Sequence, residues 1–177
     1  DLGQKNIVGL EKSSVIPSDI ASTAHASDFV YNTTHDKLGC WTTAFSRKFY
    51  EDNGFFLKKG GLEICRKGDD ARWEELKRKV GSGKAFGTNV SLISASEAKE
   101  KFPLLEEESL MGAMWDPDAG LVIPRSQDVV SFAVEHAKDK GALKTFTDTP
   151  AIDFEVENGR VTGVHTDKGF IKADRVV

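Results

Sequence analysis

The chain has 177 residues and a formal net charge of −4 at pH 7, with 29% charged and 39% hydrophobic residues. This composition is typical of a globular protein. It offers no basic stripe for nucleic acid and no apolar run of the roughly 20 residues that a membrane helix needs. Cys40 and Cys65 follow no metal-binding or disulfide spacing, which favours a reducing compartment.

The first predicted elements are a strand, a loop and a helix. Residues 6–10 (NIVGL) form a short apolar run with β-branched side chains, which predicts a buried strand. Residues 12–35 show no period and are rich in Ser, Thr and Ala, so we expect a long loop. From residue 35 to residue 52, apolar side chains recur at helical spacing and Asn53-Gly54 follows, which predicts a helix.

The middle of the chain predicts strands that alternate with helices. Residues 55–67 have the pattern of a strand, a glycine break and a second strand, and a helix is predicted over 69–80. The sequence SLI predicts a further short strand. After it, Ser94 and Glu97 have the spacing of a capping box, so we expect a helix to begin there and to end at Pro103.

The last third of the chain begins with two short predicted strands, 109–115 and 120–124, on either side of a turn. A helix is predicted over 125–140, with Gly141 as the residue that ends it. The stretch ALKTF then predicts another strand. Predicted strands and predicted helices alternate along the chain up to this point, which indicates a protein of mixed α and β structure.

The C-terminal segment predicts a β-meander. Asn158-Gly159 has the composition of a two-residue hairpin turn. In the register that this turn implies, Val156 faces Val161 and Phe154 lies opposite Gly163. A strand over FIKADRVV completes the pattern. We therefore expect an α/β fold with an α+β insertion.

Glu11 is the first candidate functional residue. It directly follows an apolar strand, as does the acidic residue that binds the two ribose hydroxyls of an adenosine in dinucleotide-binding folds. The matching G-x-G-x-x-G turn should lie about 20 residues earlier, ahead of the first residue of this chain. The alternative is a solvated carboxylate at a strand end, and this alternative stays open on the pattern alone.

His25 is the second candidate. It is the only imidazole in SDIASTAHASDF, residues 18–29, where its neighbours are small. It can be an idle surface or core histidine, a base, a metal ligand or a covalent anchor. The other histidines are far away in the sequence, so a metal site is not expected. Neither cysteine stands in an activating context for a Cys–His pair.

Together the segments of the chain resemble a known family. In order they are LEK, STAHA, GGLEI, E-LKRKV, FPLL, DPDAGLVIP, GALK and NGRVTGVHTDKGFIKADRVV. This collinear set, which covers essentially all 177 residues, resembles the FAD-dependent amine and amino-acid oxidoreductases, within the sarcosine and dimethylglycine dehydrogenase or oxidase branch. The resemblance implies oxidation of the C–N bond of a small N-methylated amino acid, with a hydride equivalent passing to flavin N5.

The resemblance also implies which residues contact FAD. Glu11, with Lys12 beside it, matches the acid that binds the adenosine ribose. Ala151 matches a residue whose backbone contacts the adenine. The loop that passes the pyrophosphate and reaches the isoalloxazine corresponds to Ser22, Thr23, Ala24 and His25.

His25 matches the position at which several members of the family bind FAD covalently through its 8α carbon. The residues after it, Ala26-Ser27-Asp28, depart from the Ala-Pro-Gly or Ala-Ala-Gly that the branch often has there. Two alternatives therefore remain for this histidine, a covalent bond to the flavin or mere proximity to it. The resemblance implies that the residues that bind the amino-acid carboxylate and act on the amine lie beyond Val177, so no catalytic residue is assigned in this chain.

The resemblance implies a partial Rossmann-like FAD-binding sheet with a β-meander, together with part of a mixed-sheet substrate domain. The expected division, in chain order, is FAD-binding domain 1–35, helical connection 36–54, substrate domain 55–124 and FAD-binding domain again 125–177. The chain opens without Met and closes on an apolar stretch, so we expect a piece of a longer protein. No secretory leader is visible, and we expect the cytoplasm, or the mitochondrial matrix in a eukaryote.

Expected partners are a small amine substrate and, as electron acceptor, oxygen or an electron-transfer protein. No nucleic acid, membrane span or metal is expected, and the sequence does not indicate an oligomeric state. Two alternatives stay open. One is another enzyme of the superfamily, similar to glycine oxidase or glycerol-3-phosphate dehydrogenase. The other is a truncated, non-catalytic interaction module.

Overall fold

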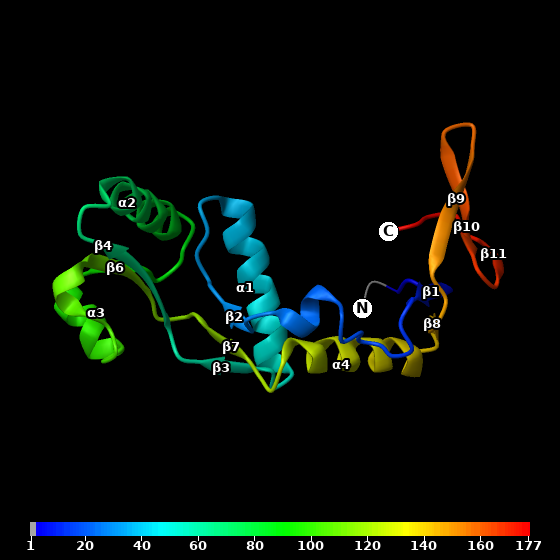
Figure 1. Ribbon diagram of the computed structural model, residues 1–177, viewed down its shortest axis with the longest axis horizontal. Helices are drawn as coiled ribbons and strands as arrows, with labels where there is room; N and C mark the ends of the chain where they lie inside the picture. Colours follow the sequence, from blue (N-terminus) through cyan, green and yellow to red (C-terminus); the bar gives the residue numbers. More distant parts are fainter. Residues whose placement is uncertain (1–2) are drawn as a thin grey trace. The chain divides into compact units, whose positions relative to one another are not determined.

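The computed structural model describes residues 3–177, and the chain forms two compact units. Unit 1 combines the described residues up to Ala26 with Ser126–Val177, and unit 2 comprises Ser27–Arg125. Figure 1 labels most of the helices and strands of the two units. The expected assignment of these parts to a cofactor-binding and a substrate-binding domain stays a prediction.

Unit 1 is built around a pair of parallel strands. β1 (Ile7–Leu10) pairs with β8 (Leu143–Phe146) in a register that runs from Ile7 opposite Leu143 to Leu10 opposite Phe146. α4 (Ser126–Asp139) leads into β8, and Gly141 ends this helix as predicted, with a φ of 64° that favours glycine. The parallel pairing confirms the expected α/β arrangement at this end of the chain.

The C-terminal segment of unit 1 is an antiparallel meander. It consists of β9 (Ala151–Glu157), β10 (Arg160–Thr166) and β11 (Gly169–Lys172), in the order β11-β10-β9. Asn158 and Gly159 have φ angles of 52° and 76°, which are the left-handed values that a type I′ hairpin turn requires. The predicted meander and its turn are therefore confirmed, although the last strand ends at Lys172 rather than at the end of the chain.

One register prediction in the meander is wrong. Val156 lies opposite Val161 as expected, but Phe154 lies opposite Val164 and not Gly163. The pairing shifts by one residue between Val161 and Gly163, which indicates a β-bulge. A bulge adds one residue to one strand only, so a register counted outward from the turn fails beyond it.

Unit 2 holds two antiparallel sheets. The first, in the order β2-β7-β3, joins β2 (Phe29–Val30), β7 (Gly120–Val122) and β3 (Phe56–Lys58). The second, in the order β4-β6-β5, joins β4 (Gly61–Arg66), β6 (Leu110–Asp116) and β5 (Ser91–Ile93). The expectation of an unbroken loop over 12–35 is wrong in part, because the 3₁₀ helix η1 (Ser22–His25) and β2 lie within it.

The core of unit 2 lies between the second sheet and α2 (Asp70–Ala85), which covers one face of it (Figure 1). Its buried apolar side chains are Cys65, Leu76, Val80, Val90 and Met114. The predicted helix over 69–80 is too short, because α2 continues for more than a turn past Val80. Gly83 lies in that extra turn, where a Cβ atom would approach Thr88 Oγ1 and Thr33 Cγ2 to 2.5 and 2.7 Å. Glycine there permits close packing rather than ending the helix.

α1 (Lys37–Asp52) confirms the helix predicted from apolar spacing, with Asp36 as its N-cap. Its apolar side chains are nevertheless exposed, since Leu38, Trp41 and Phe45 each keep more than 60% of their surface accessible.

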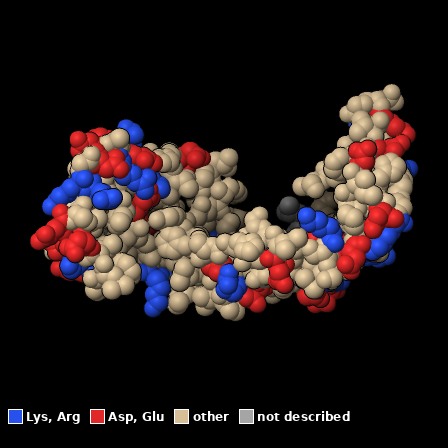
Figure 2. Space-filling view, in the orientation of Figure 1, with Lys and Arg blue, Asp and Glu red and all other residues tan. Residues whose placement is uncertain are grey.

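In Figure 2 charged side chains of both signs cover the region of α2 and α3 on the visible face. None of the helices in residues 3–177 is long and apolar enough to cross a membrane.

The predicted capping box is present at the start of α3 (Ala95–Lys101), which precedes the 3₁₀ helix η2 (Glu107–Ser109). Ser94 Oγ accepts a hydrogen bond from the backbone N–H of Glu97 at 3.2 Å, and Glu97 Oε2 accepts one from the N–H of Ser94 at 2.7 Å. The Ser94 hydroxyl and the Glu97 carboxylate thus accept from backbone N–H groups that have no acceptor within the helix.

We expect Ser94→Ala to lower the free energy of unfolding of unit 2 by about 1 kcal/mol, because it removes one acceptor at the helix N-terminus. Urea unfolding followed by tryptophan fluorescence measures this, since Trp41, Trp73 and Trp115 all lie in unit 2. Ser94→Thr keeps the acceptor and serves as the control. An Ala variant as stable as the Thr variant would contradict the capping role.

Candidate functional site

The candidate site in unit 1 lies where β1 ends. The backbone N–H of Glu11 still bonds to Phe146 O at 2.9 Å, so the parallel ladder reaches this residue. The chain then turns, and Glu11 Oε1 accepts a hydrogen bond from the N–H of Ser13 at 2.7 Å. This short turn fixes the carboxylate at the carboxyl end of a parallel strand, which is where α/β sheets bind ligands.

The electrostatics of the turn keep Glu11 ionised. The N–H of Ser13 is the largest influence and lowers the pKa of the carboxyl below its ordinary value, and the charge of Lys12 lowers it further. Desolvation acts in the opposite direction but does not prevail. An ionised carboxylate is purely an acceptor, so it suits a ligand that offers hydroxyl donors.

A second turn, Thr147–Asp148–Thr149, lies against the Glu11 turn. The N–H of Thr149 donates to Glu11 O at 3.0 Å, and the N–H of Asp148 donates to Ser13 O at 2.9 Å. Asp148 has a φ of 48°, a left-handed value that Asp tolerates better than most residues. β9 starts two residues after this turn, at Ala151, so the structure brings Glu11, Lys12 and Ala151 into one part of unit 1.

The loop after Glu11 is anchored by its own hydroxyl groups. Ser13 Oγ and Ser18 Oγ lie 2.8 Å apart, and Ser18 is buried with 3% of its surface exposed. Ser18 Oγ also accepts a hydrogen bond from the N–H of Ile20 at 3.3 Å. Gln127 Nε2, on α4, donates to Asp19 Oδ1 at 3.3 Å. The loop is thus a defined path that leads from Glu11 to η1.

The four residues of η1 are the predicted flavin-facing residues Ser22, Thr23, Ala24 and His25, and η1 packs against α4. The N–H of Ala24 donates to Ala21 O at 3.0 Å. His25 is exposed, and its ring makes no hydrogen bond or ion pair within the described part of the chain. The loop of residues 12–21 joins η1 to the Glu11 turn along the chain.

Sequence inspection missed four polar residues around this site: Ser13, Ser18, Thr149 and Lys168. Ser13 had a usable signal, because a serine two residues after a strand-end acid can form a tight turn around its carboxylate. The other three carried no local signal. Lys168 bonds residues 19 and 21 positions away in the sequence, the N–H of Thr149 bonds Glu11 near the other end of the chain, and the burial of Ser18 depends on the fold.

Residues 3–177 contain no group of three or more His, Cys, Asp or Glu side chains that could hold a metal ion. His165 and Glu155 form a pair on the meander, with Nε2 and Oε2 2.6 Å apart, and the ring of Phe170 packs beside the imidazole. They line an open groove on the meander. Two potential ligands alone do not make a metal site.

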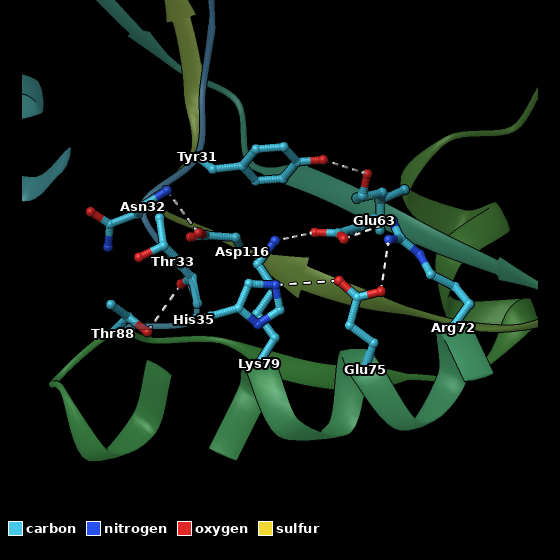
Figure 3. Close-up of polar contacts among 12 residues, drawn as sticks. Tyr31, Asn32, Thr33, His35, Glu63, Arg72, Glu75, Lys79, Thr88 and Asp116 are labelled. Carbon is cyan, nitrogen blue, oxygen red and sulfur yellow. Dashed lines mark hydrogen bonds and ion pairs between the residues drawn. The ribbon is translucent and has the colours of Figure 1, made fainter. Parts of the chain in front are cut away.

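Unit 2 contains a separate polar cluster, shown in Figure 3. Glu63 on β4 accepts from Arg72 Nη2 at 2.7 Å and from Lys79 Nζ at 2.6 Å, and both cations come from α2. Arg72 also contacts Glu75, which in turn lies 3.3 Å from His35 Nε2. Each charged side chain in this cluster lies near one of opposite charge. The cluster therefore has a structural role, which is to link the sheet to the helix α2.

Two further groups border this cluster. Burial, followed by the negative charge of Glu63, raises the pKa of the Tyr31 phenol, so this group stays protonated and donates to Leu62 O at 3.3 Å. Asp116 is fully buried and accepts from the N–H groups of Asn32 and Asp118 at 3.0 and 3.1 Å. The carboxylate of Asp116 therefore has backbone N–H groups as its hydrogen-bond partners and does not face an open cavity.

Comparisons with known proteins extend over the whole chain. Residues 3–177 match the profile described as FAD dependent oxidoreductase. The pyruvate dehydrogenase phosphatase regulatory subunit of Mus musculus mitochondria is 26% identical over 99% of this chain. The mitochondrial sarcosine dehydrogenase of Homo sapiens is 30% identical over 75% of it.

Solved structures share the fold. The L-proline dehydrogenase of P. horikoshii matches 97% of this chain at 25% identity, with a TM-score of 0.76. The glycine oxidase of Bacillus cereus matches 98% at 23% identity, with a TM-score of 0.69. The chain spans 51% and 47% of those two chains, and 20% and 15% of the mouse and human relatives.

Proposed function

Because this chain belongs to the FAD-dependent oxidoreductase family, we propose that it supplies the adenosine-binding edge and the flavin-facing loop of an FAD site. The observation that carries the proposal is the ionised carboxylate of Glu11, held by Ser13 at the end of a parallel strand. A ribose offers two neighbouring hydroxyl donors, and a carboxylate offers two acceptor oxygens. The fit is one of complementary hydrogen bonding.

The residues present fit FAD in three respects. Glu11 would accept hydrogen bonds from the ribose, with Lys12 beside it. The backbone of Ala151, at the first position of β9, would contact the adenine. The small residues Ser22, Thr23 and Ala24 would let their backbone approach the cofactor closely. Bound FAD would accept a hydride equivalent from the carbon beside an amine nitrogen.

For the whole protein we propose oxidation of a small N-methylated amino acid of the sarcosine or dimethylglycine type. The 30% identity to a sarcosine dehydrogenase favours this substrate class over the others. Glycine oxidase-like and glycerophosphate oxidase-like activities fit the fold similarly, since proteins of both kinds share it. Two relatives are named as mitochondrial, so we propose the mitochondrial matrix, with oxygen or an electron-transfer protein as electron acceptor.

A second function is favoured by one specific observation. The relative that matches 99% of this chain is named as a regulatory subunit, not as a dehydrogenase. A protein of this kind would use the same fold as an interaction module. The two functions differ in whether an amine reduces the bound flavin.

The test is made on a purified protein that carries this sequence together with the remainder of the family fold. An enzyme is expected to be yellow, and its flavin absorbance is expected to bleach without oxygen when sarcosine or dimethylglycine is added. Bleaching by glycine or glycerol 3-phosphate instead would reassign the substrate. A yellow protein that none of these compounds bleaches would favour the regulatory function. A colourless protein would contradict the enzymatic function and the proposed FAD site.

We further propose that His25 is bonded to the 8α carbon of FAD, because its exposed ring has no protein partner in the described residues. Such a bond would hold the flavin through an imidazole nitrogen of His25. Its formation would release the N–H proton and one methyl proton, and the two electrons would remain on the flavin. Mass spectrometry of the denatured, digested protein is expected to find flavin on the peptide that contains His25. In His25→Ala the flavin should be released by acid. Release from the wild-type protein, with FAD still bound before denaturation, would contradict the bond alone.

A further inference from the structure

The turn between β10 and β11 reaches the candidate site through one lysine. Lys168 Nζ lies 3.0 Å from Thr149 Oγ1 and 3.2 Å from Thr147 O, both in the turn that packs against Glu11. Thr149 is 4% exposed, so the ammonium group bonds to a buried hydroxyl. The ammonium group thus has two acceptors in one turn, of which one is a backbone carbonyl.

The three groups form a closed set of hydrogen bonds. Thr149 Oγ1 donates its own hydrogen to Thr147 O at 2.7 Å, so its lone pairs are available to accept from Lys168. Thr147 O accepts from both. Two N–H groups of the ammonium and the hydroxyl of Thr149 therefore have acceptors in this set. The cation strengthens these bonds because one partner is charged.

The lysine is itself aimed by its turn. Thr166 Oγ1 donates to Gly169 O at 2.7 Å and accepts from the N–H of Lys168 at 3.1 Å. Thr166 also pairs with Ala151 across the meander. The same turn thus contacts the Thr147–Thr149 segment through a side chain and Ala151 through the sheet.

A short path connects the ammonium group to the carboxylate. Lys168 fixes Thr147–Thr149, and the N–H groups of Thr149 and Asp148 fix Glu11 O and Ser13 O. Ser13 in turn holds Glu11 Oε1. We infer that Lys168 is a positioning residue for the adenosine-binding edge. This inference rests on the function proposed for Glu11. It acts through the two turns and does not itself bind the nucleoside.

The test uses the apoprotein that carries this sequence together with the remainder of the family fold, with isotope labelling and two readouts. The first is amide hydrogen exchange at Asp148 and Thr149, which Lys168→Met is expected to accelerate roughly tenfold, because a charge-assisted contact to their turn is lost. The second is NMR titration with adenosine and with 2′,3′-dideoxyadenosine. The variant is expected to lose most of the preference for adenosine, and Lys168→Arg should recover both readouts.

Lys172→Met is the matched control, since it removes the same charge from β11 without touching either turn. Unchanged amide exchange and unchanged adenosine preference in Lys168→Met would overturn the inference. Accelerated exchange with a normal preference would also overturn it, because the lysine would then be structural only. If the wild-type chain shows no adenosine preference, the proposed function of Glu11 fails and the inference fails with it, while normal exchange still shows that the turn is intact.

Discussion

Glu11→Gln is expected to weaken adenosine binding by roughly tenfold or more, because hydrogen bonds to a charged acceptor contribute about 1.5–3 kcal/mol each. The amide oxygen of Gln can still accept from the N–H of Ser13, so the turn should keep its shape. What is lost is the negative charge and one of the two acceptor oxygens. Adenosine should then bind little better than 2′,3′-dideoxyadenosine, which lacks both hydroxyl donors.

NMR titration of the labelled chain measures both affinities, and the turn amides serve as reporters of the site. Glu97→Gln is the matched control, because Glu97 likewise accepts from a serine N–H but lies in unit 2. Gln also works in a capping box, so this control should fold normally. An adenosine preference that survives in Glu11→Gln would show that the strand-end carboxylate is merely solvated.

The lowered pKa of Glu11 adds a pH dependence to this result. The folded carboxyl has a lower pKa than the unfolded one, so its contribution to stability is present above the unfolded pKa. It is lost as the pH falls through the folded pKa. Adenosine affinity should follow the ionised form, staying level from pH 7 down to about 5 and declining only below the range of an ordinary glutamate. The Gln variant should show no such decline.

The strand before Glu11 and the helices were predictable because their signals are local. An apolar run, a capping box at Ser94 and an Asn158-Gly159 turn each specify structure within a few residues. Apolar spacing likewise predicted α1, but it could not indicate what its apolar side chains contact. In the structure Trp41 and Phe45 stack on each other and remain exposed.

The errors have a common physical cause, which is that packing overrides local signals. Gly83 would weaken an isolated helix, yet here it lets α2 approach Thr33 and Val90. The bulge between Val161 and Gly163 depends on pairing across the meander, and no single strand encodes it. In the candidate site, Glu11 was found from its position after a strand. Thr149 and Lys168 were not, because only the folded chain brings them together.

Glu63→Met is expected to destabilise unit 2 by about 3 kcal/mol, because it removes the partner of two cations in a poorly hydrated place. The side chains of Glu63 and Lys79 are only 10% and 12% exposed, so the lysine would lose this partner with little water around it. Arg72 is 35% exposed and keeps Glu75, so it should contribute less to the loss. Urea unfolding followed by tryptophan fluorescence reports on this unit alone.

The double variant Glu63→Met/Lys79→Met decides whether the loss comes from an uncompensated charge or from poor packing. If the charge is responsible, removing it should restore much of the stability, so the double variant should be more stable than Glu63→Met. Lys79→Met alone should cost less, since Arg72 still neutralises Glu63. Added salt should change these differences little, because nearly buried pairs are weakly screened. Strictly additive losses would mean that Glu63 and Lys79 are not coupled, despite the 2.6 Å between their Oε2 and Nζ atoms.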